Sequence, residues 1–162
     1  KNSNTLVILP TGLGKTKIAI LLAIHELNKS PNSKVLITSP TKPLSAQLCE
    51  EFKKNTNIEK ISLLTGATTP NKRKEIWDNS TVLAATPQTI RSDIDNNRIN
   101  LDKVKLLIID ECHRSKMHYA TTILAKDYKN KILALTASPG NTKEKIEEIC
   151  NNLNIENIEI RT

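Results

Sequence analysis

The chain has 162 residues, a length typical of one domain, and its 24 basic and 17 acidic side chains give it a net charge of +7. This charge permits nucleic acid as a partner, but one Phe, one Trp and two Tyr are too few for a base-stacking surface, so contact with nucleic acid should go through phosphates. No apolar run reaches transmembrane length, and three cysteines without C-x-x-C spacing indicate neither a zinc site nor a disulfide framework, which fits a reducing cytosol.

Short apolar runs alternate with helical patterns along the chain. They occupy residues 5–9, 35–38, 61–64, 82–85, 106–109, 132–135 and 158–160. Such alternation predicts an α/β fold with a mostly parallel central sheet of about seven strands and helices on both faces. The fifth run, Leu-Leu-Ile-Ile, has no polar alternation, as expected of a central strand that is covered on both sides.

The first apolar run leads into a phosphate-binding loop pattern, and a helix is predicted over 15–28 directly after it. Its two glycines let successive backbone N–H groups turn toward an anion. Lys15 would reach the β- and γ-phosphates of ATP, and the Thr16 hydroxyl would bind Mg²⁺. Leu9 stands where the usual spacing has glycine, and a chance turn before a helix is the alternative. The predicted nucleotide-binding residues are Pro10, Thr11, Gly12, Leu13, Gly14, Lys15 and Thr16.

The segment after the second run has the pattern of a helix start. Thr41 is predicted to cap a helix that runs through Phe52, with Pro43 in its first turn. Lys42 beside this helix start suits a phosphate, and Gln47 follows about one turn later. Ordinary solvated surface explains Lys42 and Gln47 equally well.

Two further helices are predicted after the third and fourth runs. The first, over 71–77, carries a Lys-Arg-Lys run of the kind that usually forms a solvated face, and Trp77 is expected to be a packing residue. The second begins with Thr86 as N-cap and Pro87 at the first helical position. This helix start suits a backbone phosphate, with Arg91 placed to assist, and a purely structural cap is the alternative.

The fifth run ends in an Asp-Glu-Cys-His sequence. Two adjacent carboxylates after a fully apolar strand need a partner, because buried charges are costly unless they are paired or bind a metal. Asp110 would therefore hold Mg²⁺, and Glu111 would accept a proton from the attacking water. Cys112 is expected to be a small buried residue, and His113 is as consistent with a surface position as with a functional one.

Two small hydroxyl side chains, Thr136 and Ser138, follow the sixth run. They could cap the helix predicted to begin at Lys143. They could also hydrogen bond to the groups that hold the metal. The residues alone do not decide between these two roles.

Taken together and in order, these segments resemble the motifs of superfamily 2 helicases, and the match covers nearly the whole chain. Three segments most resemble those of the archaeal Hef helicases and their relative FANCM, which remodel forked and branched DNA. The sequences of these segments are Leu-Pro-Thr-Gly-Leu-Gly-Lys-Thr, Pro-Thr-Lys-Pro-Leu and Thr-Ala-Ser-Pro-Gly. The Asp-Glu-Cys-His form is common in the RNA-sensing RIG-I branch, whereas Hef more often has alanine in place of Cys112.

The resemblance implies roles for residues in each motif. Lys15 and the loop around it bind ATP and Mg²⁺, Asp110 binds Mg²⁺, and Glu111 activates water. His113 is the fourth catalytic residue and links the γ-phosphate state to the rest of the protein, with Thr136 and Ser138 as its coupling partners. The residues expected along the nucleic-acid backbone are Thr41, Lys42, Gln47, Gly66, Thr86 and Gln88.

The resemblance also implies a domain organisation. Residues 1–162 would form the first RecA-like domain, which binds ATP, and the second RecA-like domain would lie outside this chain. Because the second domain brings the arginine fingers, the isolated first domain should bind nucleotide weakly and hydrolyse it barely. The expected protein is archaeal, cytoplasmic and associated with the nucleoid, with no membrane contact.

Three other functions compete with a helicase or translocase on branched DNA. The first is an RNA helicase, or an ATPase directed by double-stranded RNA, of the RIG-I and Dicer type. The second is a non-catalytic nucleic-acid-binding ATP switch, against which the water activator Glu111 argues. A small-molecule kinase, the third, leaves the proline-rich strand ends and the His after the acidic pair unexplained.

Overall fold

The computed structural model describes residues 4–10, 12, 14–113, 118–137 and 143–160. Seven strands form one sheet in the order β3-β4-β2-β5-β6-β1-β7, and every pairing in it is parallel. The strands are β1 (Thr5–Ile8), β2 (Lys34–Thr38), β3 (Ile61–Leu63), β4 (Val82–Ala85), β5 (Val104–Ile109), β6 (Lys131–Thr136) and β7 (Asn157–Ile160). The predicted α/β fold is confirmed, and each of the seven apolar runs became a strand.

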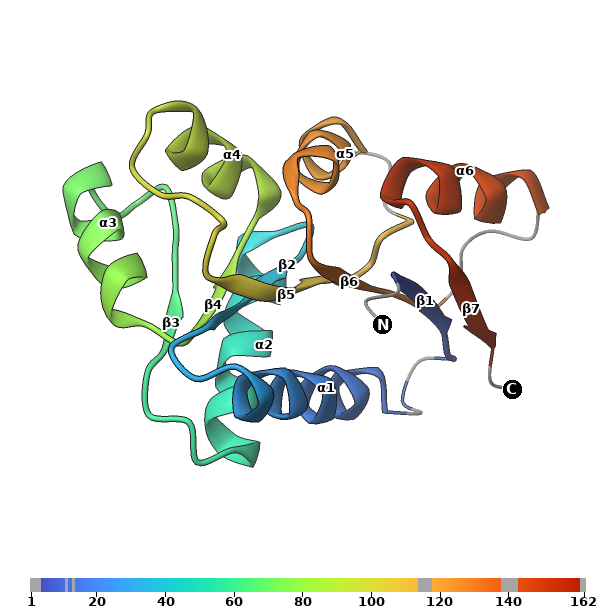
Figure 1. Cartoon of the computed structure of the whole chain (residues 1–162), viewed down its shortest axis with the longest axis horizontal. Helices are drawn as coiled ribbons and strands as arrows, with labels where there is room; N and C mark the ends of the chain where they lie inside the picture. The colour runs from blue at the N-terminus through green and yellow to red at the C-terminus, as the bar shows by residue number, and fades with distance from the viewer. Residues whose placement is uncertain (1–3, 11, 13, 114–117, 138–142, 161–162) are drawn as a thin grey trace.

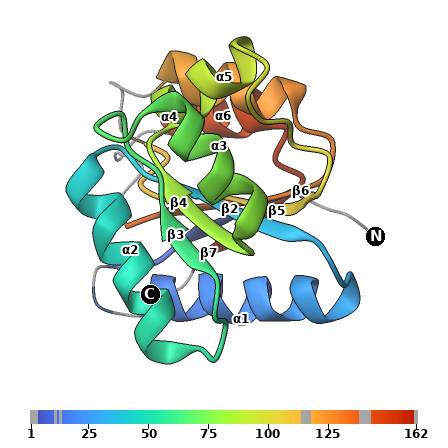
Figure 2. The same ribbon diagram turned by 90° about the vertical axis from the view of Figure 1, so that its left-hand side faces the viewer.

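The helices cover both faces of this sheet (Figures 1 and 2). They are α1 (Lys15–Lys29), α2 (Lys42–Asn55), α3 (Pro70–Asn79), α4 (Pro87–Asp95), α5 (His118–Asp127) and α6 (Lys143–Leu153). Phe52 of α2 packs with α1 and the side chains on one face of the sheet. Trp77, Ile90, Leu124 and Ile149, from the other four helices, pack on the opposite face.

Local sequence signals mark the starts of α2 and α4. The Thr41 side chain accepts a hydrogen bond from the Leu44 N–H at 3.3 Å and caps α2, as predicted. Thr86 occupies the predicted N-cap position of α4, but its hydroxyl pairs with the Thr89 hydroxyl at 3.1 Å rather than with a backbone N–H. Helix α5 was not predicted from the sequence, and it begins directly after residues that lie outside the described ranges.

The strand order divides the carboxyl edge of the sheet into two halves. Because all strands are parallel, every segment that leaves a strand end emerges at this edge, where open α/β sheets bind ligands. The neighbouring strands β5, β6 and β1 lead to the predicted nucleotide residues. The neighbouring strands β3, β4 and β2 lead to the predicted nucleic-acid residues. The two halves meet where β2 pairs with β5.

Candidate functional site

The two glycines between β1 and α1 have backbone conformations that are typical of anion-binding turns. Gly12 and Gly14 have φ angles of +88° and +98°, in the left-handed region that glycine tolerates best. Gly14 is also the N-cap of α1, and its carbonyl accepts the first helical hydrogen bond, from the Ile18 N–H at 3.1 Å. The backbone N–H groups before Ile18 have no helical partner, and they stand at the positive end of the helix dipole. Thr11 and Leu13 lie outside the described residues.

Lys15 and the acidic pair meet across the sheet edge. The Lys15 Nζ lies 2.7 Å from Oε1 of Glu111 and 3.7 Å from Oδ1 of Asp110. Asp110 continues the ladder beyond β5, since its N–H donates to the Thr38 carbonyl at 2.9 Å. Glu111 has a φ of +52°, a conformation that is uncommon for a residue with a side chain. This turn aims the Glu111 carboxylate at Lys15, which begins α1.

Burial sets the electrostatics of this site. Burial raises the pKa of Asp110 above its ordinary value, and the Lys15 ammonium opposes this rise. A cation that binds beside a carboxylate desolvated in this way stabilises its ionised form. Burial also raises the pKa of the neighbouring Cys112 to about 12, so this thiol is an uncharged packing group. The side chain, expected to be buried, is only partly buried against the core.

An open cleft of about 480 Å³ lies between the loop, the acidic pair and helix α2. Its lining residues are Gly12, Gly14, Lys15, Thr16, Lys17, Leu44, Gln47, Leu48, Glu51, Asp110 and Glu111. The volume is within the range of ordinary small-molecule sites. Among the residues the structure describes, no three His, Cys, Asp or Glu side chains form a metal cage. The Thr16 hydroxyl and the Asp110 carboxylate are hard oxygen donors on this cleft, and they fit a Mg²⁺ whose other ligands are water and phosphate.

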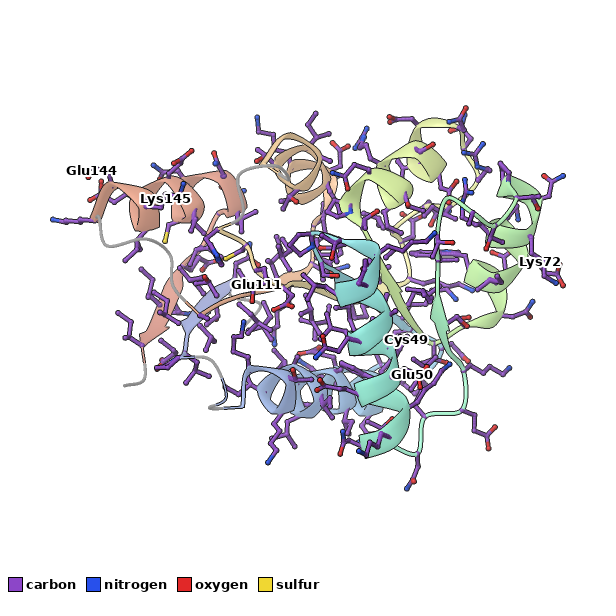
Figure 3. All side chains as sticks on the ribbon, turned by 180° about the vertical axis from the view of Figure 1, so that it is seen from behind. Cys49, Glu50, Lys72, Glu111, Glu144 and Lys145 are labelled. Atoms are coloured by element: carbon purple, nitrogen blue, oxygen red, sulfur yellow. The ribbon has the colours of Figure 1, made fainter. Side chains whose placement is uncertain are left out.

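His113 connects the acidic pair to β6. Its Nδ1 lies 2.5 Å from the hydroxyl of Thr136, which is fully buried at the end of β6. Its Nε2 lies 3.6 Å from Oε2 of Glu111 on the other side of the ring. The predicted pairing of His113 with Thr136 is therefore present, while Ser138, its other predicted partner, lies outside the described residues. Figure 3 shows Glu111 in the interior of the view, between the helix layers.

The predicted nucleic-acid residues divide between two places. Thr41, Lys42, Gly66, Thr86 and Gln88 follow the neighbouring strands β2, β3 and β4 at the carboxyl edge. Backbone hydrogen bonds join these segments beyond the strands, from Ser39 to Ala85 at 3.2 Å and from Leu64 to Ala84 at 2.9 Å. Gln47 instead lines the open cleft beside Lys15, where its Nε2 lies 3.5 Å from Oε1 of Glu51.

Two arginine side chains, Arg91 and Arg73, have other partners than the sequence predicts. Arg91, expected to assist at a phosphate, donates to Asp127 at 2.6 Å and to Asp95 at 2.7 Å and so joins α4 to α5. Arg73, expected on a solvated face, is only 6% exposed and pairs with the buried Asp93. Trp77, four residues after Arg73, could have signalled this burial, because residues four apart share a helix face.

Residues 1–146 match the profile of the DEAD/DEAH box helicases. The chain belongs to this family. The structure is similar to the crystal structure of the Pyrococcus furiosus Hef helicase domain, with a TM-score of 0.92 and 46% sequence identity. The match covers 99% of this chain and 35% of the Hef chain. A DEAD box protein from Methanococcus jannaschii, 21% identical with a TM-score of 0.82 over 98% of this chain and 46% of its own, shares the fold.

Curated relatives are similar over almost the whole of this chain. One, from Methanocaldococcus jannaschii, is 47% identical over 98% of this chain and 21% of its own length, and its name assigns it provisionally as an ATP-dependent RNA helicase. Another, the ATP-dependent DNA helicase MPH1 of Scheffersomyces stipitis, is 40% identical over 98% of this chain and 16% of its own length. The chain thus spans about a fifth or less of these relatives. Of the helices in its described residues, none combines the length and apolarity needed to cross a bilayer.

Proposed function

We propose that this chain is the first RecA-like domain of an ATP-dependent helicase or translocase that acts on forked or branched DNA. The contact of Lys15 with Glu111 and Asp110 carries the proposal, because it brings the loop after β1 and the acidic pair after β5 into one cleft. This cleft shares the carboxyl edge of the sheet with the segments after β2, β3 and β4. A nucleotide and a nucleic-acid backbone can therefore bind side by side.

Six of the residues that line the cleft have a defined role in this proposal. Bound MgATP supplies the transferable phosphoryl group. Gly12 and Gly14 turn backbone N–H groups toward its phosphates, while Thr16 and Asp110 provide the oxygen ligands for the metal. Lys15 holds the Glu111 carboxylate in this structure. With its ammonium on a phosphate instead, Lys15 would leave Glu111 to accept a proton from the attacking water.

A second RecA-like domain of the same protein is part of the proposal. The chain covers only 35% of the Hef helicase-domain structure that it resembles, which supports a further catalytic half. That half would face the cleft and supply arginine side chains to the transferring phosphoryl group. Since such arginines contribute a factor of about 10³ to 10⁵ in rate, residues 1–162 alone should hydrolyse ATP barely.

The relatives favour DNA over RNA as the polynucleotide. MPH1 is named a DNA helicase, and the Hef helicase domain is the related structure at 46% identity. The name of the Methanocaldococcus jannaschii relative and the residue Cys112 favour RNA and keep an RNA-directed ATPase as the second candidate. Segments that contact phosphates through backbone N–H groups carry no base readout, so we propose binding without sequence specificity.

The full-length protein that carries this domain distinguishes these candidates. Steady-state ATP hydrolysis is measured with forked DNA and with duplex RNA of the same length, with Glu111→Gln as the inactive control. Greater stimulation by forked DNA supports the proposal, and greater stimulation by duplex RNA replaces it with the RNA-directed ATPase. If both polynucleotides bind and neither stimulates hydrolysis, the protein is a nucleic-acid-binding ATP switch.

A further inference from the structure

Arg73 occupies an unusual position on α3. Its neighbours Lys72 and Lys74 are exposed and pair with acidic residues of the same helix. Figure 3 shows the Lys72 label at the outer side of α3. Arg73 is only 6% exposed, so its charge is buried among residues that come from other segments.

The partner of Arg73 is Asp93 of α4, which is fully buried. Both oxygens of this carboxylate accept hydrogen bonds from Arg73, from its Nε at 2.9 Å and its Nη2 at 2.8 Å. Arg98 donates to the same carboxylate through its Nε at 2.7 Å. Burial by itself would raise the pKa of Asp93, but the hydrogen bonds from the two arginines outweigh it and hold the pKa below its ordinary value. Asp93 is therefore ionised and held in a bidentate pair.

A third contact of Arg73 reaches toward the proposed nucleic-acid edge. Its Nη1 donates to the carbonyl of Thr68 at 2.6 Å, and the Thr68 N–H donates to the Thr65 carbonyl at 3.2 Å. These bonds hold the turn 65–68, which contains Gly66. One guanidinium group thus joins this turn to α4, the helix that starts at Thr86 and Pro87.

The two arginines on Asp93 differ in what else they hold. Arg98 reaches Asp93 and, at 3.4 Å, the hydroxyl of Ser92, both on α4. Of the two arginines, only Arg73 also bonds to the turn 65–68, and it so connects this turn to α4. Buried ion pairs are weak sources of stability, because desolvation cancels much of their attraction. The fixed fork of a guanidinium is instead well suited to set the geometry between two segments.

We propose that Arg73 is a positioning residue for nucleic-acid binding, which rests on the proposed function above. It holds the turn 65–68 against α4 so that the backbone near Gly66 and the start of α4 at Thr86 face the same polynucleotide strand. Arg73 does not line the nucleotide cleft, and none of these bonds reaches a residue that does.

The test compares Arg73→Gln with Arg98→Gln in the full-length protein. Each variant removes one positive charge and leaves Asp93 with one arginine, but only Arg73→Gln loses the bond to Thr68. We expect Arg73→Gln to raise the forked-DNA concentration that half-saturates ATP hydrolysis roughly tenfold, with the basal rate and the KM for ATP unchanged. Arg98→Gln should stay within about twofold of the wild type.

Amide hydrogen exchange provides a second measurement. If Arg73→Gln does not fold, Arg73→Lys serves as a milder variant. Exchange over residues 65–69 should become faster in either Arg73 variant and stay unchanged in Arg98→Gln. An Arg73 variant that folds and binds DNA like the wild type overturns the inference, as does an equal loss of affinity in Arg98→Gln. A wild-type protein that does not bind DNA at all overturns the proposed function instead.

Discussion

Replacing Gly14 with alanine tests the geometry of the phosphate-binding loop. The φ of Gly14 is +98°, and a left-handed backbone costs a residue with a Cβ atom about 1–2 kcal/mol. An added Cβ would meet only side-chain atoms of Lys17, at 3.9 and 4.0 Å, so no clash adds to this cost. Because 1 kcal/mol shifts the melting temperature of a domain of this size by about 2–4 °C, we expect Gly14→Ala to lower it by about 2–8 °C.

Gly66 provides the matched control for Gly14. Its φ lies outside the left-handed region and an added Cβ would meet no atom within 4 Å, so Gly66→Ala should leave the melting temperature unchanged or raise it slightly. Thermal unfolding with and without a non-hydrolysable MgATP analogue measures both effects, since a ligand stabilises only the protein that binds it. Gly14→Ala should lose that ligand-induced rise and Gly66→Ala should keep it. Equal destabilisation by the two substitutions would refute the reasoning.

Further predictions concern the acidic pair and its partners. Glu111→Gln should lower ATP turnover by about 10² to 10⁴ while fluorescent-nucleotide titration shows retained binding; unchanged turnover removes Glu111 from its role. Thr136→Val deprives His113 of its hydroxyl partner, so the ratio of DNA-stimulated to basal hydrolysis should fall; an unchanged ratio contradicts the coupling. Burial raises the pKa of Asp110 in the folded state above its value in the unfolded chain. As the pH falls from above the folded-state pKa toward the unfolded-state pKa, the wild type should therefore gain stability relative to Asp110→Asn. Parallel curves of melting temperature against pH for the two proteins would contradict this prediction.

The fold was predictable because its signals are local and repeated. Each strand is a short apolar run, and the absence of polar alternation in the fifth run correctly placed β5 between two neighbours. The helix starts at Lys15 and Lys143 were also predicted where they occur. The observed strand ends differ from the predicted ones by one or two residues, because strand pairing depends on which residues of the neighbouring strand lie opposite. For example, β5 begins at Val104, where Lys34 of β2 lies opposite it.

The candidate site was predictable where its residues are adjacent in sequence. The phosphate loop and the acidic pair are such segments, and the structure brings Lys15 and Asp110 within 3.7 Å of each other. The pair of Arg73 and Asp93 was not predicted, since it joins residues 20 positions apart on two helices whose relative rotation is set by packing. The position of Gln47 in the cleft likewise depends on how α2 lies across the sheet.

The contact between β2 and β5 gives the two halves of the site a short physical connection. Thr38, the last residue of β2, accepts the N–H of Asp110 at 2.9 Å, and the segment that leads to Thr41 begins directly after it. Helix α2 starts at this segment and carries Gln47 into the nucleotide cleft about a turn and a half later. If nucleic-acid binding shifts the Thr41 segment, either helix α2 or the hydrogen bond between Thr38 and Asp110 must therefore move with it. Packed interiors transmit such shifts because they do not deform freely, so the fold can couple the proposed polynucleotide binding to the position of Asp110, the proposed metal ligand, without a long relay.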